Sequence, residues 1–255
     1  MCGLAGFNLS PDENVDARDL AVELLLGIED RGRHATGVAF FEQGEPYVQK
    51  ADITAEKFVD HLDMDARVTN AILHTRWASQ GSPKNNANNH PIDVGGIMGV
   101  HNGVIWNDND LFDRVRQVTG EDKRIAEVDS EAIFATLLHG GEKAPVALGR
   151  VKGSASVAWL DAYGDPDLLH AARISSSPFV YAFSEVGSFV FASTALAVKD
   201  AMQAVGMKMV GMTHALGEGT YLRVREGEVL TRVAFETHKR GALTAVEAKA
   251  LNVAG

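Results

Sequence analysis

The sequence predicts an α+β protein whose sheets are antiparallel, from the spacing of its apolar residues and from the connections between them. Short apolar stretches typical of strands alternate with a few amphipathic helical stretches, and from residue 154 onward most strands follow one another through short turns. Parallel strands need long crossover connections, most often helical. We therefore expect antiparallel sheets with helices beside them, in preference to a doubly wound parallel sheet.

The first half of the chain begins with an apolar strand at residues 3–9. Residues 16–29 then repeat apolar side chains at the spacing of an amphipathic helix, with Asp16 as its N-cap and Gly32 as its stop. Further strands are expected at residues 36–42, 46–50, 70–75 and 97–101, and further helices at 55–62, 109–118 and 130–139.

The second half consists mainly of strands. They are expected at residues 156–161, 168–174, 179–183, 189–192, 219–224 and 227–234, with one helix at 194–205. Glu226 and Gly227 form the turn between the last two strands. Since the sequence shows no repeat, linker or low-complexity segment, we expect one domain over residues 1–255, with a core at 2–235 and an Ala-rich tail at 237–255.

Composition and charge exclude several classes of protein. The 255 residues carry a formal net charge of −10, which disfavours nucleic acids as partners. Cys2 is the only cysteine, so no disulfide forms within the chain. Because no stretch resembles a signal peptide or a membrane span, we expect a cytoplasmic protein that does not bind a membrane.

Metal and cofactor sites are not predicted. The nine histidines fall at spacings unrelated to those of metal ligands, so we interpret them as structural residues or loop hydrogen bonders. The stretch from Gly32 to Gly37 superficially resembles a phosphate-binding loop, but it lacks the Gly-Lys-Ser/Thr ending. We therefore expect no metal and no cofactor.

The position of Cys2 suggests a nucleophile. Removal of Met1, which a small second residue favours, leaves a thiol and an α-amine on the same residue. The unperturbed pKa is about 8.5 for a thiol and about 7.7–8.0 for an α-amine, so the amine can act as a general base near neutral pH without a histidine. The alternative interpretation is an incidental cysteine near a chain end.

Three further groups of residues have both a functional and a structural interpretation. Arg76, beside Trp77 at a strand end, suits bidentate binding of a carboxylate, but a surface arginine is the commoner explanation. Asn102 and Gly103 can form an oxyanion hole, although Asn-Gly is more often a turn. Asp129 precedes a helix, where it either binds an ammonium group or caps the helix.

Six short segments, taken together and in order, carry a resemblance to a known family. They are Cys2–Gly6, Arg31–Gly37, His74–Ala78, Asn89–Pro91, His101–Gly103 and Asp129–Glu131. They resemble the class II glutamine amidotransferases, which are N-terminal-nucleophile glutaminase domains, and most closely the domain of glucosamine-6-phosphate synthase. The resemblance extends over residues 2–235.

The resemblance implies a fold and a catalytic apparatus. The fold is a four-layer αββα sandwich of two antiparallel sheets. Cys2 is the implied nucleophile, which attacks the side-chain amide of L-glutamine while its own α-amine relays the proton. Asn102 and the backbone amide of Gly103 are implied to stabilise the oxyanion.

The resemblance also implies how glutamine is bound. Arg76 holds the α-carboxylate and Asp129 the α-ammonium group, while Trp77, Ser79 and His90 line the pocket. This agrees with the residues themselves, since an amino acid zwitterion needs one fixed cation and one fixed anion around the nucleophile.

Two loops depart from the family pattern, and the chain departs in length. Ser79-Gln80 stands where the aminosugar enzyme usually has Thr-His, and His34 stands where Asp is usual. The chain ends where a synthetase domain would begin in the family. We therefore expect a glutaminase subunit that passes ammonia to a separately encoded synthase.

Two alternatives remain open at this point. One is a stand-alone amidohydrolase of the same fold, acting on a γ-glutamyl or other amide with water as the only acceptor. The other is a catalytically silent relative that serves as a binding or regulatory module. The intact set of Cys2, Arg76, Asn102, Gly103 and Asp129 argues against a silent protein.

Overall fold

The computed structural model describes residues 1–238, whose strands form two sheets in which every neighbouring pair is antiparallel. The first sheet has the strand order β11-β9-β10-β1-β4-β2-β3. Its strands are β1 (Gly3–Asn8), β2 (Ala35–Glu42), β3 (Glu45–Ala51), β4 (Asn70–Arg76), β9 (Val180–Phe183), β10 (Phe189–Ala192) and β11 (His214–Ala215). The second sheet has the order β13-β12-β8-β7-β6-β5. Its strands are β5 (Ile92–Val94), β6 (Ile97–Ile105), β7 (Gly153–Asp161), β8 (Leu168–Ser175), β12 (Thr220–Arg225) and β13 (Glu228–Ala234).

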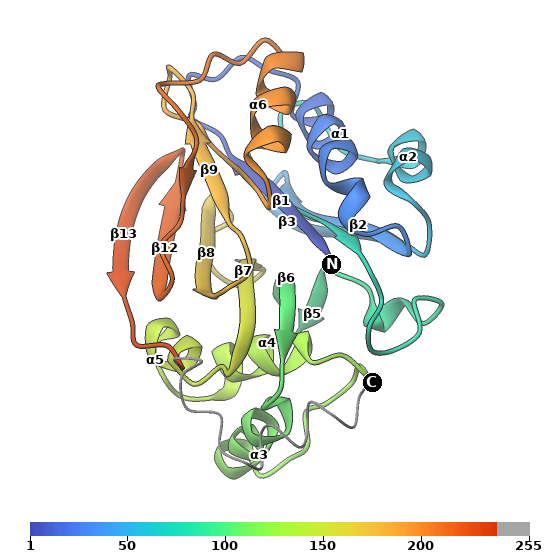
Figure 1. Ribbon diagram of the computed structural model, residues 1–255, viewed down its shortest axis with the longest axis vertical. Helices are drawn as coiled ribbons and strands as arrows, with labels where there is room; N and C mark the ends of the chain where they lie inside the picture. Colours follow the sequence, from blue (N-terminus) through green and yellow to red (C-terminus); the bar gives the residue numbers. More distant parts are fainter. Residues whose placement is uncertain (239–255) are drawn as a thin grey trace.

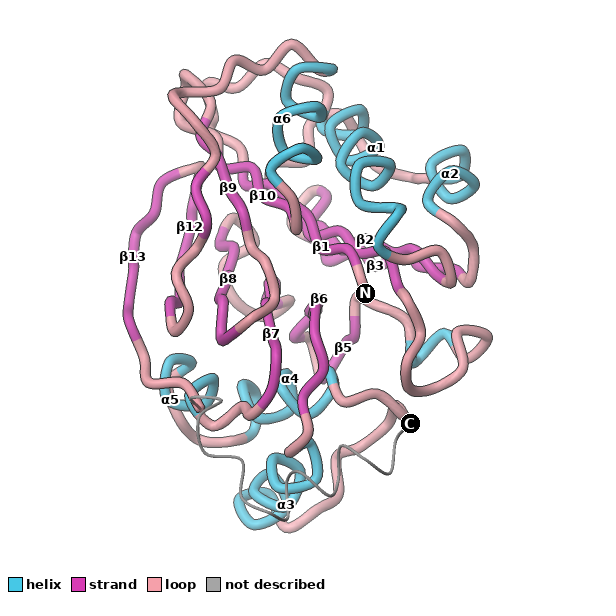
Figure 2. The backbone as a smooth tube through the Cα atoms, in the orientation of Figure 1, coloured by secondary structure: helices cyan, strands magenta, loops and turns pink. Residues whose placement is uncertain are grey.

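Helices cover the outer face of each sheet, which makes four layers (Figure 1). The helices on the first sheet are α1 (Ala17–Ile28), α2 (Ala55–Phe58) and α6 (Ala195–Ala204). Those on the second sheet are α3 (Asp108–Thr119), α4 (Ser130–His139) and α5 (Ala144–Gly149). Figure 2 shows the helices on opposite sides of the molecule with the strands between them. The expected α+β sandwich of two antiparallel sheets is confirmed.

Apolar side chains fill all three spaces between the layers. β1 is buried along its whole length because it lies in the middle of the first sheet. Its Phe7 packs beneath the helices, while Leu4 faces the second sheet together with Phe179 and Phe191. Burial on both faces explains why the strand is apolar up to Phe7 instead of alternating.

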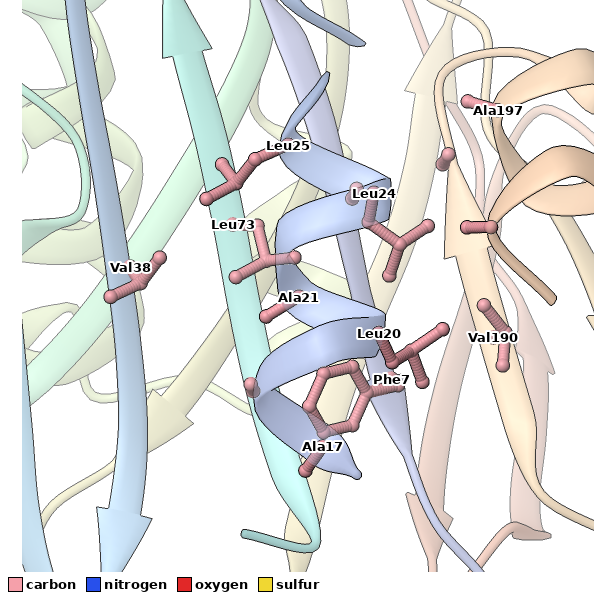
Figure 3. Packing of buried hydrophobic residues seen from close by; sticks show 14 of the residues in the cluster. Phe7, Ala17, Leu20, Ala21, Leu24, Leu25, Val38, Leu73, Val190 and Ala197 are labelled. Atoms are coloured by element: carbon pink, nitrogen blue, oxygen red, sulfur yellow. The ribbon is translucent and has the colours of Figure 1, made fainter. Parts of the chain in front are cut away.

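The first helix shows how the sequence pattern produces this packing. The Asp16 side chain accepts hydrogen bonds from the backbone N–H groups of Arg18 and Asp19, so α1 begins where the sequence predicts it. Leu20, Leu24 and their neighbours at helical spacing are fully buried against the first sheet and α6 (Figure 3). Full burial of such a side chain stabilises the fold by about 1.5–3 kcal/mol.

Most expected elements are present, and the differences lie in short or polar segments. The sequence analysis did not predict β5, β11 or α5, which are brief. The strand expected at residues 97–101 was too short, because β6 continues to Ile105. The turn at Glu226 and Gly227 has the positive φ angles, 51° and 81°, that suit a tight hairpin.

The structure bears only in part on two other expectations, the absence of a membrane span and the C-terminal tail. None of the helices within residues 1–238 is long and apolar enough to cross a membrane. From residue 239 onward, the tail expected at residues 237–255 lies outside the described part of the chain. The single-domain organisation stays a prediction.

Leu24→Ala should destabilise the fold without touching the candidate site. Leu24 is 0% exposed, so truncation leaves a cavity and should lower the free energy of unfolding by about 2–5 kcal/mol. The matched control is Leu26→Ala on the same helix, since Leu26 is 40% exposed and should lose much less. Urea unfolding followed by circular dichroism measures both variants. Equal losses in the two variants would contradict the packing of α1 described above.

Candidate functional site

The candidate site forms where the ends of three strands meet. β1 pairs with β4 so that Gly3 lies opposite Thr75, which places the preceding residue, Cys2, beside Arg76 and Trp77. β6 of the second sheet packs against both strands. Figure 1 shows the N-terminus close to β6.

The structure brings all eight residues predicted from the sequence to this point. Seven of them line one cavity, and they are Cys2, Arg76, Trp77, Ser79, His90, Gly103 and Asp129. Asn102 lines a second cavity, which shares Cys2, Trp77, Ser79 and Gly103 with the first. Their geometry therefore fits one site, although their individual roles stay predictions.

The Cys2 sulfur lies against the backbone of Trp77. The Trp77 N–H donates to Sγ at 3.4 Å, and the thiol contacts the Trp77 carbonyl oxygen at 3.6 Å. Burial raises the pKa of the Cys2 thiol, while the Trp77 N–H and the positive charge of Arg76 oppose this, and the charge of Asp129 adds to it. The charge of the N-terminal ammonium group also lowers this pKa, so the sulfur lies within the field of two cations and one anion.

Arg76 is buried, and its guanidinium is held by the loop that follows β4. It donates to the Asn89 side-chain oxygen at 2.8 Å, to the Gly81 carbonyl at 2.9 Å and to the Gln80 carbonyl. Burial lowers the pKa of Arg76, and the Cys2 and Asp129 charges oppose that shift. The surface-arginine interpretation is therefore wrong. Asn89, which no sequence signal marked as a site residue, fixes the direction of the guanidinium.

Asp129 precedes α4 but does not cap it through its side chain. Its Oδ2 accepts a hydrogen bond from the Ile105 N–H at 2.8 Å, and Ser130 Oγ lies 3.4 Å from Oδ1. The helix-cap alternative is therefore wrong. The carboxylate is fixed by the end of β6 and lines the cavity opposite Arg76.

Asn102 and Gly103 lie inside β6, so the turn interpretation of this pair is also wrong. They pair with Ser156 and Ala155 of β7. Gly103 has φ +134°, and a Cβ there would lie 1.7 Å from the Ser154 carbonyl oxygen, so only glycine fits. The pair is a distortion within a strand, and both residues line a cavity together with Cys2.

The side chain of Asn102 is oriented by Ser193, which follows β10. Ser193 Oγ accepts from Asn102 Nδ2 at 2.6 Å and from the Leu4 N–H at 2.9 Å, and it donates to the Leu4 carbonyl at 3.1 Å. An amide nitrogen carries two N–H groups, so one remains for a ligand. Ser193 lies outside the six segments that carry the family resemblance, and nothing in the sequence assigned it this contact.

Three buried histidines lie together at the cavity, and two of them, His90 and His101, line it. His74 donates from Nε2 to the His101 carbonyl at 3.0 Å, its ring lies 4.1 Å from that of His90, and His101 Nδ1 lies 2.8 Å from Ser130 Oγ. Burial lowers the pKa of all three, that of His74 to about 3. Within residues 1–238 no group of histidine, cysteine and acidic side chains could hold a metal.

His34, one of the departures from the family pattern, contacts the loop after β4. Its Nδ1 accepts from the Ala78 N–H at 2.9 Å, and its ring lies 4.9 Å from that of Trp77. An aspartate at this position has no ring to stack on Trp77. His34 therefore holds the backbone that touches the Cys2 sulfur.

The cavity between Arg76 and Asp129 is closed down in this structure. Its volume is about 20 Å³, which is room for roughly one water molecule. The carbonyl groups of Gln80 and Gly81 lie on the guanidinium of Arg76. A ligand larger than a water molecule therefore fits beside Arg76 only if the segment 79–81 moves.

Comparisons with known proteins fit this geometry. A family model described as a glutamine amidotransferase domain matches residues 74–200. Glutamine–fructose-6-phosphate aminotransferase of Listeria innocua is 29% identical, over 92% of this chain and 39% of the relative. The enzyme of the same name from Mesorhizobium japonicum is 32% identical, over 68% of this chain and 28% of the relative. The chain spans about two fifths of the length of the first of these relatives.

Solved structures share the fold. Glutamine phosphoribosylpyrophosphate amidotransferase from B. subtilis superimposes with a TM-score of 0.74 at 16% identity, over 93% of this chain and 50% of that chain. A glutamine aminotransferase class-II domain protein from Silicibacter pomeroyi gives 0.56 at 17% identity, over 92% of this chain and 100% of that chain. At these identities the likeness concerns the fold alone.

The buried histidines should make stability depend on pH in mild acid. An unfolded histidine gains a proton below about pH 6.5, whereas folded His74, with a pKa of about 3, stays neutral. The unfolded state then binds more protons, so the free energy of unfolding should fall by about 1.4 kcal/mol per pH unit for each such histidine. Urea unfolding at pH 7.5, 6.5 and 5.5 measures the slope.

Two variants separate this effect from general acid sensitivity. His74→Gln removes one buried imidazole. It should therefore reduce the slope of the free energy of unfolding against pH by about 1.4 kcal/mol per pH unit. His61→Gln changes an exposed histidine and should leave it unchanged. A free energy of unfolding that is constant between pH 7.5 and 5.5 would show that the buried rings accept protons.

Proposed function

Since the chain belongs to the class II glutamine amidotransferase domain family, we propose that its site hydrolyses the side-chain amide of L-glutamine to glutamate and ammonia. The observation that carries the proposal is the position of the Cys2 sulfur in a cavity lined by the cation of Arg76 and the anion of Asp129. A free amino acid has one carboxylate, which can pair with Arg76, and one ammonium group, which can pair with Asp129. Bound in this way, it would place its side chain near the Cys2 sulfur.

Glutamine is proposed to enter when the segment 79–81 moves off Arg76. The substrate carboxylate then replaces the carbonyl groups of Gln80 and Gly81 on the guanidinium, while Asn89 keeps its contact. Asp129 accepts from the α-ammonium group. Trp77, Ser79 and His90, which line the same cavity, are proposed to contact the bound amino acid.

The proposed chemistry needs Met1 to be removed, which places the α-amine on Cys2. The amine takes the thiol proton, and the sulfur attacks the amide carbon to give a tetrahedral intermediate. The free N–H of Asn102 and the backbone amide of Gly103 are proposed to donate to its oxyanion. The proton passes to the departing nitrogen, which leaves as ammonia, and water then hydrolyses the Cys2 thioester to release glutamate.

Cys2 variants should test the nucleophile directly. Cys2→Ala should abolish glutamate release while leaving the free energy of unfolding close to wild type, since the change is small. Cys2→Ser should retain little activity, because a hydroxyl is far less acidic than a thiol. Intact-protein mass spectrometry should show loss of Met1, and an electrophilic glutamine analogue should label wild type but not Cys2→Ala. Full activity in a chain that keeps Met1 would overturn the mechanism.

We further propose that the ammonia passes to a synthase on a separate chain. A second cavity of about 340 Å³ adjoins Cys2, with Val104, Ser154 and Ser177 in its wall. Val104 and Ser154 also line a surface groove of about 1200 Å³, so the cavity and the groove share part of their wall. Ammonia that reaches water is largely protonated and loses its nucleophilicity, so an acceptor must cover this groove.

Glutamate release should depend on the partner. The free chain should turn over slowly because the closed segment 79–81 occupies Arg76, and a synthase that orders an open form should accelerate it several-fold. A tagged, inactive Cys2→Ala variant is used to capture partner proteins. The rate of glutamate release is then measured for the purified wild-type chain alone and with those proteins added. A fast enzyme that cell extract does not change would contradict the proposal. Preference for γ-glutamyl amides over glutamine would indicate a stand-alone amidohydrolase.

A further inference from the structure

Lys50, near the end of β3, turns its side chain away from water toward the loop that ends at Pro91. Its ammonium group donates to the Asn89 carbonyl at 2.8 Å and to the Pro91 carbonyl at 2.8 Å. β3 is an edge strand whose first four residues are exposed, and Lys50, the sixth, is half-buried. Its long side chain could therefore extend into water. Its contacts with two backbone carbonyls therefore call for a reason other than strand formation.

Burying this ammonium group carries a cost. Loss of solvation lowers the pKa of Lys50 to about 8, and the charge of Asp93 on β5 only partly opposes this. His90 also faces the lysine, but burial keeps its pKa well below the usual value, so it is uncharged at neutral pH. No carboxylate within the described residues pairs with the ammonium group at salt-bridge distance. The hydrogen bonds to the Asn89 and Pro91 carbonyl groups compensate for the lost solvation of the ammonium group.

The same loop rests directly on β2. Gly37 pairs with Lys50 across the sheet, and a Cβ on Gly37 would lie 2.2 Å from the His90 carbonyl oxygen. The missing side chain thus lets residues 89–91 lie on the sheet, while Lys50 holds them from the neighbouring strand. A third contact joins the loop to β3, since the Asn86 side chain donates to the Lys50 carbonyl at 3.0 Å.

The contacts continue from the loop to Arg76. Asn89, whose carbonyl accepts from Lys50, has a fully buried side chain that accepts from Arg76 Nη1 at 2.8 Å. Lys50 is therefore joined to Arg76 through one residue. His90, which lines the cavity, lies between the two carbonyls that Lys50 binds.

We propose that Lys50 is a positioning residue for substrate binding, which fixes residues 89–91 and through Asn89 the direction of the Arg76 guanidinium. This inference rests on the proposed function, because it assigns Arg76 to the carboxylate of glutamine. Lys50 touches neither substrate nor the reacting atoms, so its effect should fall on binding. The chemical step at Cys2 should keep its rate once glutamine is bound.

The first test compares three variants in a glutamate-release assay. Lys50→Met keeps most of the length of the side chain but removes its donors, and it should raise KM for glutamine roughly tenfold with kcat little changed, since hydrogen bonds from a charged group are stronger than those between neutral groups. Lys50→Arg keeps charge and donors and should recover most of the wild-type KM. Lys57→Met changes an exposed lysine on α2 and is the matched control.

The second test uses pH and compares the wild type with Lys50→Arg alone. The ammonium form of Lys50 is present below about pH 8 and is lost above it, so the wild-type KM should rise between pH 7 and 9. The α-amine of glutamine titrates in the same range. This titration of the substrate affects wild type and Lys50→Arg alike, but the arginine side chain keeps its positive charge at pH 9. The KM of wild type should therefore rise more steeply with pH than that of Lys50→Arg.

The outcomes separate this inference from the proposed function. A wild-type chain without glutaminase activity overturns the proposed function. An active wild type, with KM unchanged in Lys50→Met and the same pH dependence in Lys50→Arg, overturns only the role of Lys50. A fall in kcat at constant KM also overturns it, since the residue would then act on the chemical step.

Discussion

The pairing of β1 with β4 is the constraint on which the candidate site depends. Its register sets Gly3 opposite Thr75, which places Cys2 at the backbone of Trp77 and near the charge of Arg76. A slip of one residue would turn every side chain of β1 to the other face, exchanging Leu4 between the sheets with Phe7 beneath the helices. The burial of both faces therefore fixes the register, and the hydrophobic core determines where the sulfur lies.

Much of the fold was predictable because the helices and longer strands follow periodic apolar patterns. Asp16 and the buried face of α1 are examples, since both arise from neighbours within a few residues of one another. The ordered motifs marked the eight candidate residues, and these are close together in space. The Asn102-Gly103 pair shows the limit of local patterns, because a dipeptide that favours a turn lies within a strand where Ser154 leaves no room for a side chain.

Residues that act on the site through others were not predicted to do so from the sequence, although Asn89 lies in one of the six ordered segments. Lys50, Asn89 and Ser193 all contact residues distant in the chain or backbone atoms, and backbone atoms are the same whatever the sequence. Their side chains are common in loops and on surfaces, so composition does not single them out. Contacts of this kind require the tertiary structure, in which β3, the loop before β5 and the segment after β10 converge.

The Ser193 hydroxyl ties the start of β1 to Asn102 by bonding both Leu4 and the amide. Only Gly3 separates this anchor from Cys2, and each residue of extended chain spans about 3.5 Å. A chain trimmed or extended by one residue at this end would carry its terminal amine that far from the sulfur's present place. Many proteins tolerate variation in the length of their termini. Here the anchored strand fixes the distance between the terminal amine and the sulfur. The proposed removal of Met1 must therefore cut one particular peptide bond, and the anchored strand leaves little room for insertions before Leu4.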